Sequence, residues 1–299
     1  MNSYKHKIIS TLLVTVATYF GFQALDLISG IYQIETYFMV AWYVAIFHTF
    51  WLLFIFDLHL KIKGHWAHAY SKYAGIEAFF YALKLRIRHF YHWLYVKKYL
   101  TYLILPSIFY WSVVILMYLN PFHELFKDAL IIISTVSLSI TYWHFKEAFS
   151  KHMEMHQTGL KIQNLVKLLA GYLMYTALLA VGWYFGFSLL ALMLVVFVMT
   201  FLLVYQALYQ HRLIKGEVYP AILVLSTLIT LIFAVVSLKW NVNYYSAGLM
   251  VSASYNLCWS VFHRYLHRTL PRKLLWEYVF MFIVLISLIL STHDFQGRI

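Results

Sequence analysis

Apolar residues in this chain fall into long stretches that are separated by short polar segments. Each stretch has about 20 residues, the length that an α-helix needs to cross about 30 Å of hydrocarbon. Because lipid cannot satisfy an open backbone, every stretch is expected to be a helix. The pattern therefore predicts an all-α, polytopic membrane bundle that forms a single transmembrane domain over 1–299. Its nine predicted passes are 8–29, 37–60, 100–119, 129–145, 166–185, 187–209, 219–238, 245–263 and 273–291.

The composition agrees with this pattern and excludes several other classes of protein. Apolar and aromatic residues make up 63% of the chain and charged residues 11%, whereas a soluble domain carries about 25% charge. An ordinary soluble enzyme and a disordered chain are therefore excluded. The single cysteine, Cys258, excludes an internal disulfide and a cysteine-based metal site.

The basic residues are divided unequally between the two sides of the predicted bundle. Of the 23 Lys and Arg, only Lys127, Lys239 and Arg298 fall on one side. The positive-inside rule then places the N-terminus in the cytoplasm, and we expect the cytoplasmic (inner) membrane of a prokaryote. Topology and anionic lipids of the inner leaflet account for the net charge of +12. We expect no nucleic-acid partner.

Two longer segments are expected on the cytoplasmic side, an interfacial segment at 61–99 and a loop at 146–165. Within the first, 76–98 mixes aromatic and basic residues, which is typical of an amphipathic helix that lies on the leaflet. Its basic side chains would be costly across hydrocarbon. On the other side, the run from Gly182 to Gly186 predicts a tight turn between two passes, with a helix-dimer motif as the alternative.

Histidines are concentrated at the predicted cytoplasmic face. The chain has 15 His but only 11 acids. The four even-numbered passes run inward, and they end near His59, His144, His211 and His263, so they bring imidazoles to one depth. His263 and His267 are four residues apart, so they project from the same face of one helix. Imidazole is the commonest metal ligand in proteins.

This arrangement predicts one metal site at the cytoplasmic side, and an all-imidazole donor set with open positions suits iron, copper or zinc. The predicted ligands are His59, His144, His263 and His267. His211 is a reserve ligand because its pass ends at the same depth. Asp57 is the carboxylate expected to orient a ligating imidazole. The alternative is that these amphipathic side chains only anchor helix ends at the headgroups.

The order of these features resembles a known family of membrane enzymes. The run SerIleThrTyrTrpHis144Phe is followed, after three passes, by the pair His263 and His267. This is similar to the Brp/Blh family of membrane β-carotene 15,15′-dioxygenases, which make retinal, and the similarity covers about 40–290. The family's first motif is Gly-Leu-Pro-His-Gly, whereas this chain has Asp-Leu-His59. The resemblance implies a non-haem iron held by four His, with dioxygen and an apolar carotenoid as substrates.

Three functions remain open at this point. The first is a membrane-embedded non-haem iron oxygenase that acts on a carotenoid or another apolar isoprenoid or lipid. The second is a non-enzymatic membrane subunit or scaffold whose His residues are interfacial anchors. The third is a haem-binding or transport protein, for which His48 is the only histidine in the middle of a pass. Bound metal separates the first from the second, and a Soret band identifies haem.

Overall fold

The structure of the protein is a computed structural model. The residues that it describes are 2–59, 71–73, 75–78, 80–81, 84, 93–119, 124–149, 157–210, 218–239, 243–266 and 271–291.

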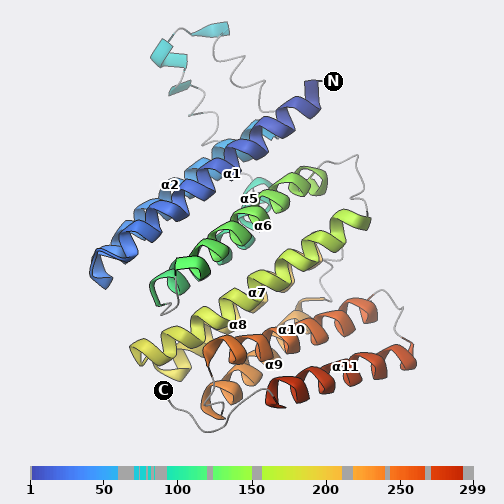
Figure 1. The fold of residues 1–299 in the computed structure, drawn as a ribbon. Coiled ribbons are helices and arrows are strands. Elements are labelled where there is room, and N and C mark those ends of the chain that lie inside the picture. Colours follow the sequence, from blue (N-terminus) through green and yellow to red (C-terminus); the bar gives the residue numbers. More distant parts are fainter. Residues whose placement is uncertain are drawn as a thin grey trace. The chain divides into compact units, whose positions relative to one another are not determined.

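Every predicted pass corresponds to a long α-helix, and the described residues contain no strand. The all-α class is therefore confirmed. Figure 1 shows the helices in chain order. Their bounds, within the part of the chain that is described, are α1 (Asn2–Ser29), α2 (Ile34–His59), α5 (Trp93–Leu119), α6 (Glu124–Phe149), α7 (Gln157–Phe185), α8 (Leu189–Gln210), α9 (Tyr219–Lys239), α10 (Tyr244–Leu266) and α11 (Arg272–Ser291).

Five helices are long and apolar enough to cross a membrane, which makes the chain an integral membrane protein. The apolar part of α5, Leu103–Leu119, is shorter. The five candidate spans among the described residues are Thr11–Ser29, Leu125–Trp143, Lys161–Phe185, Leu189–Tyr209 and Tyr219–Leu238.

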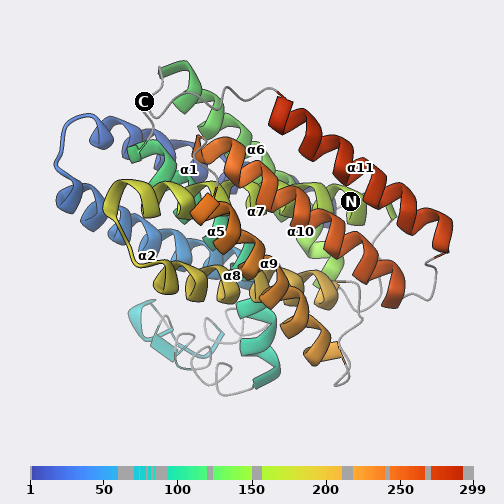
Figure 2. The same cartoon turned by 90° about the horizontal axis from the view of Figure 1, so that it is seen from below.

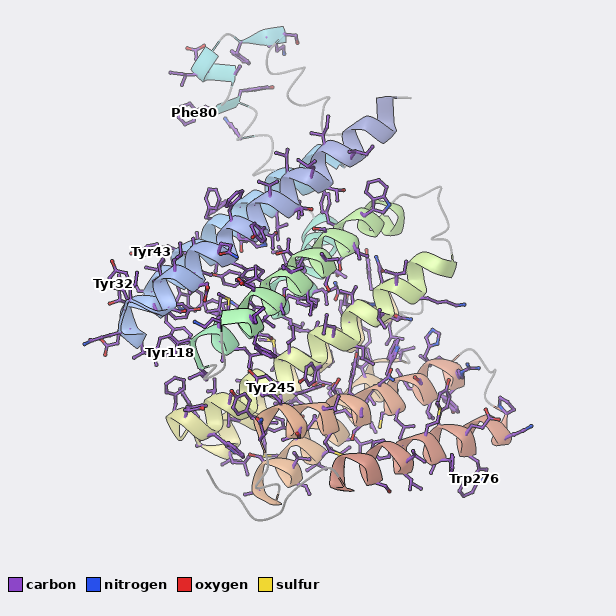
Figure 3. All side chains as sticks on the ribbon, viewed as in Figure 1. Tyr32, Tyr43, Phe80, Tyr118, Tyr245 and Trp276 are labelled. Atoms are coloured by element: carbon purple, nitrogen blue, oxygen red, sulfur yellow. The ribbon has the colours of Figure 1, made fainter. Side chains whose placement is uncertain are left out.

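The distribution of side chains along the helices also fits a lipid environment. On α8, Leu190 and Leu194 are 79% and 67% exposed, whereas Thr200 and Gln206 on the same helix are buried. Figure 3 shows large aromatic side chains such as Trp276 directed outward from their helices. Water would penalise such an apolar surface, but hydrocarbon favours it, and polar groups then turn inward to find partners.

Several helices extend beyond the apolar stretches that define the predicted passes. α7 begins at Gln157, so it includes much of the predicted loop 146–165, and α6 continues to Phe149. α5 begins at Trp93, so residues 93–98 belong to it rather than to the predicted surface helix 76–98. The reason is physical, because hydropathy marks only the part that crosses hydrocarbon. Backbone hydrogen bonds continue a helix into the headgroup region.

The predicted turn between α7 and α8 is confirmed at Gly186. This glycine has φ +63°, a left-handed conformation that glycine adopts without strain, and its N–H donates to the carbonyl of Gly182 at 3.2 Å. The Ser188 hydroxyl then accepts the N–H of Ala191 at 3.3 Å, which caps the start of α8. Gly182 itself lies inside α7, so the two glycines do not form one continuous helical motif.

The chain divides into two compact units. The first comprises residues 1–106 and 135–154. In it, α1 and α2 form an antiparallel hairpin (Figure 1). The hydroxyls of Thr15 on α1 and Ser139 on α6 lie 2.7 Å apart and share a hydrogen bond. Phe22 and Leu25 of α1 are fully buried in this unit.

The second unit comprises residues 107–134 and 155–299. Its helices pack in a closed cycle, α7 on α8, α8 on α9, α9 on α10 and α10 on α7, and α11 packs on α10. Figure 2 shows α11 beside α10. The buried hydroxyls of Tyr175 on α7 and Thr200 on α8 share a hydrogen bond of 3.0 Å. α7 and α10 approach closely where Gly248 meets Thr176.

Candidate functional site

The structure describes the backbone of three of the four predicted metal ligands. His59 is the last residue of α2, His144 lies near the end of α6, and His263 lies in the last turn of α10. The side chains of His59, His144 and Asp57, and the whole of His211 and His267, lie outside the described residues.

Within the first unit, α2 and α6 run in the same direction. Figure 1 shows both helices ending at the side where α1 begins. Their backbones therefore bring positions 59 and 144 to the same end of this unit, as the alternation of passes predicts. Whether the imidazoles face one another depends on side chains outside the described set.

His263 is the one predicted ligand whose surroundings are described. Its ring is partly buried and packs against Trp259, with ring centroids 5.5 Å apart and planes at 40°. The next residue, Arg264, donates from Nε to the hydroxyl of Tyr278 at 3.0 Å and lies 5.7 Å from that ring's centroid. These contacts join the last turn of α10 to α11, so the backbone that carries His263 is held in place.

No group of three or more His, Cys, Asp or Glu side chains able to hold a metal is present among the described residues. Since only His263 of the predicted set is described with its side chain, the convergence of the four imidazoles stays a prediction. The donor set itself fits iron, because neutral imidazoles suit that metal and leave coordination positions open.

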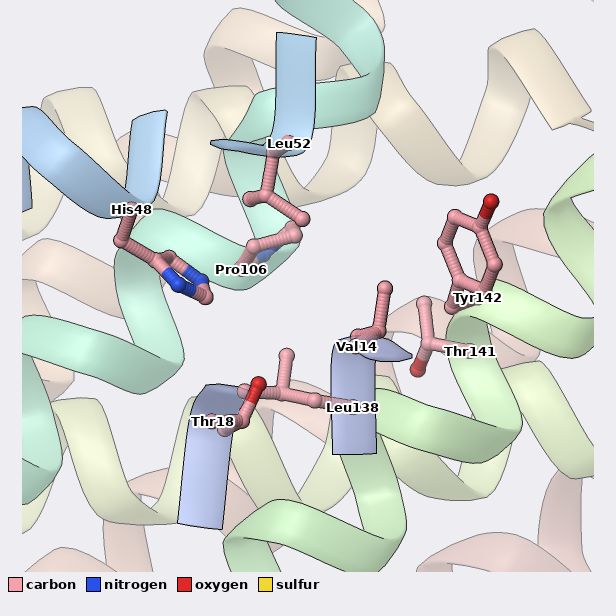
Figure 4. A pocket seen from close by; sticks show the side chains of 8 residues that line it. All are labelled: Val14, Thr18, His48, Leu52, Pro106, Leu138, Thr141 and Tyr142. Atoms are coloured by element: carbon pink, nitrogen blue, oxygen red, sulfur yellow. The ribbon is translucent and has the colours of Figure 1, made fainter. Parts of the chain in front are cut away.

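A small cavity in the first unit is lined by His48, Thr18 and mostly apolar surface (Figure 4). Its volume is about 10 Å³, which is room for about one water molecule. The imidazole of His48 and the side chain of Thr18 are directed toward it. Pro106 in α5 has no N–H, so the carbonyl one turn earlier lacks its helical donor. A cavity of this volume is far too small for a haem.

A second group of buried polar side chains lies on α7 in the other unit. Lys167 is 3% exposed and Gln163 is 1% exposed. Within the described part of the chain, no hydrogen-bond partner exists for Lys167 Nζ, for either amide atom of Gln163, or for Asn164 Oδ1. Each unsatisfied buried polar group costs about 1–3 kcal/mol. Gln163, Asn164 and Lys167 lie within five consecutive residues of α7, so these polar groups are close together along the helix.

Sequence reasoning placed Lys167 among the basic residues of the cytoplasmic face and did not anticipate that this side chain is buried, at 3% exposure. A signal was present in the chain, since Gln163 and Lys167 are four residues apart and share one helix face. Hydropathy cannot say whether such a face meets the headgroups or a neighbouring helix.

The pairing of α7 with α10 places Gln163 at about the same level along the helix axes as His263. Gly171 on α7 faces Tyr255 on α10, at 3.8 Å from a Cβ built at the glycine. The helices are antiparallel, because Trp183 lies farther along α7 and packs near Tyr244 at the start of α10. Gln163 lies eight residues before Gly171 on α7, and His263 lies eight residues after Tyr255 on α10. Because the two helices are antiparallel, Gln163 and His263 lie at about the same level along the helix axes.

No family model, curated protein or solved structure matches the chain.

Proposed function

We propose that this protein is a membrane-embedded non-haem iron oxygenase that acts on a carotenoid or another apolar isoprenoid or lipid. The observation that carries the proposal is that the passes predicted to run inward each end near a histidine, with His263 and His267 four residues apart in the sequence. His59, His144, His263 and His267 are the proposed ligands, with His211 in reserve and Asp57 as the orienting carboxylate. The resemblance to the Brp/Blh family supports the same assignment.

The helices would position the ligating imidazoles and exclude water from the metal site. Trp259 restricts the ring of His263, and the bond from Arg264 to Tyr278 holds the helix turn that carries it. The exposed apolar faces would lie in the bilayer, where an apolar substrate is dissolved. When bound, iron would supply the activation of dioxygen, which no protein side chain provides.

Metal analysis tests this proposal. Protein purified in a neutral detergent and reconstituted with Fe(II) should retain about one iron per chain. His263→Ala should lower iron affinity more than about 100-fold, because even the loss of a group that only orients a ligand costs roughly 10–100-fold. Iron would be measured by mass spectrometry, together with an absorption spectrum for a haem Soret band.

His123→Ala is the matched control, since that histidine is predicted on the opposite side of the membrane. It should leave the iron content unchanged. Equal iron retention in the wild type and in His263→Ala would overturn the metal site and favour interfacial anchors. A Soret band would favour a haem protein instead.

The proposal includes a topology of nine passes with the N-terminus in the cytoplasm, in the inner membrane of a prokaryote. In a Cys258→Ser background, Met155→Cys should be labelled only from the cytoplasmic side and Trp240→Cys only from the opposite side, using an impermeant maleimide on intact cells and inverted vesicles. The expected difference follows from the uneven distribution of Lys and Arg. Labelling of both positions from one side would contradict the topology and the shared depth of the histidines.

A further inference from the structure

We propose that the part of α7 around Lys167 is a binding site for the anionic oxygen headgroup, carboxylate or phosphate, of a membrane-soluble ligand. Lys167, Gln163 and Asn164 form this site, which we call the α7 polar site. It is independent of the proposed iron, because it rests on other side chains and on contacts within one compact unit.

The first argument is the absence of internal partners. Lys167 Nζ and both amide atoms of Gln163 are buried and have no hydrogen-bond partner among the described residues. Buried polar groups in folded proteins are almost always paired. The two side chains lie on one face of α7, one turn apart, so a single small group can contact both.

The second argument is charge. Lys167 lies six residues inside the start of the span Lys161–Phe185, which is about 9 Å along the helix axis. The four helices of the ring, α7 to α10, contain no Asp or Glu. An ammonium group at this depth is costly unless an anion accompanies it, and the ring offers none. An anion carried by a ligand would compensate the charge.

The third argument is the shape of the surroundings. One turn beyond Lys167, on the same face, Gly171 presents no side chain. A Cβ built there would come no nearer than 3.7 Å to Tyr175 or Tyr255, so a methyl-sized space lies at this position of the helix. Tyr175, Tyr255 and Trp259 are buried in the same unit and provide apolar ring faces. These neighbours suit the hydrocarbon part of a ligand.

The hydrogen-bonding groups indicate the headgroup. The Lys167 ammonium and the Gln163 amide donate, and they match the acceptor oxygens of a carboxylate or phosphate. The Gln163 carbonyl and Asn164 Oδ1 accept, so they suit a hydroxyl on the same headgroup, as in a singly protonated phosphate monoester. A simple hydrocarbon or alcohol lacks the charge that Lys167 requires.

Binding of defined probes tests the α7 polar site. Radiolabelled dodecyl phosphate and laurate would be titrated into the full-length protein in a neutral detergent, with dodecanol as a probe without the anion. At least one of the two anions should bind, and dodecanol should bind at least ten-fold more weakly. The comparison of the two anions distinguishes a phosphate from a carboxylate headgroup.

Lys167→Met removes the charge but keeps the length of the side chain. It should weaken anion binding at least ten-fold, whereas Lys161→Met, on an exposed position of the same helix, should not. Without ligand, Lys167→Met should melt at a higher temperature than the wild type, because a buried unpaired ammonium is removed. The lone thiol of Cys258, which is partly buried on α10, reports unfolding through a thiol-reactive dye.

Three results would overturn the proposal. Equal weakening by Lys161→Met and Lys167→Met would show general attraction to positive charge. Unchanged binding in Lys167→Met, or failure of both anions to bind the wild type, would show that the lysine holds no ligand. A lower melting temperature of Lys167→Met would show that the amine already has a partner within the protein.

Discussion

Gly248→Ala is expected to destabilise the second unit by about 3 kcal/mol, the upper part of the range for overpacked interiors. A Cβ at this position would lie 2.9 Å from both Cα and Cβ of Thr176, and closer still to its hydroxyl. Because one of these atoms belongs to the backbone, no change of rotamer can relieve the clash. α7 and α10 would have to move apart, and small residues at helix contacts in membranes serve to prevent that.

Reversible unfolding in mixed micelles, followed by circular dichroism, would measure the change. Gly21→Ala is the control, since a Cβ at that position on α1 meets nothing within 4 Å. It should stabilise the helix by roughly 0.5–1 kcal/mol, because glycine costs conformational entropy. Gly182→Ala should fall between the two, because its Cβ meets only the flexible end of Leu192 at 2.8 Å. Wild-type stability of Gly248→Ala would contradict the close approach of α7 and α10.

Phe22→Ala is expected to destabilise the first unit by about 2–4 kcal/mol. The ring of Phe22 on α1 is 1% exposed, so its removal leaves a cavity that the neighbouring helices cannot fill. The expected value is below that for a soluble core, because lipid is as apolar as the protein interior and only packing is lost. The same unfolding assay would measure it.

Phe20→Ala, two residues away on the same helix, provides the matched control. That ring is 64% exposed, and lipid tails would replace its contacts. We expect a change within about 0.5 kcal/mol, as for other surface substitutions. A loss of stability as large as that of Phe22→Ala would mean that α1 buries the opposite face from the one described here.

Much of the fold could be predicted from the sequence. Apolar stretches of about 20 residues identify all nine long helices among the described residues, because backbone hydrogen bonds must be satisfied within each segment in lipid. The turn at Gly186 follows from glycine's access to positive φ, and the positions of His59 and His263 near helix ends follow from the ends of the apolar stretches. Bounds such as Gln157 and Trp93 could not be predicted from hydropathy, since these helices continue beyond the apolar stretch.

The face that each helix buries was decided by the tertiary structure alone. Helices that are apolar on every side show little difference between their faces. The sequence therefore does not predict which side of a helix meets lipid and which side packs against protein. This is why the burial of Lys167 and Gln163, the contact of Gly248 with Thr176 and the different surroundings of Phe20 and Phe22 emerge only in three dimensions. The depth of the histidines comes from position along each helix, which the sequence determines. Their direction comes from the rotation of each helix, which only packing against its neighbours sets.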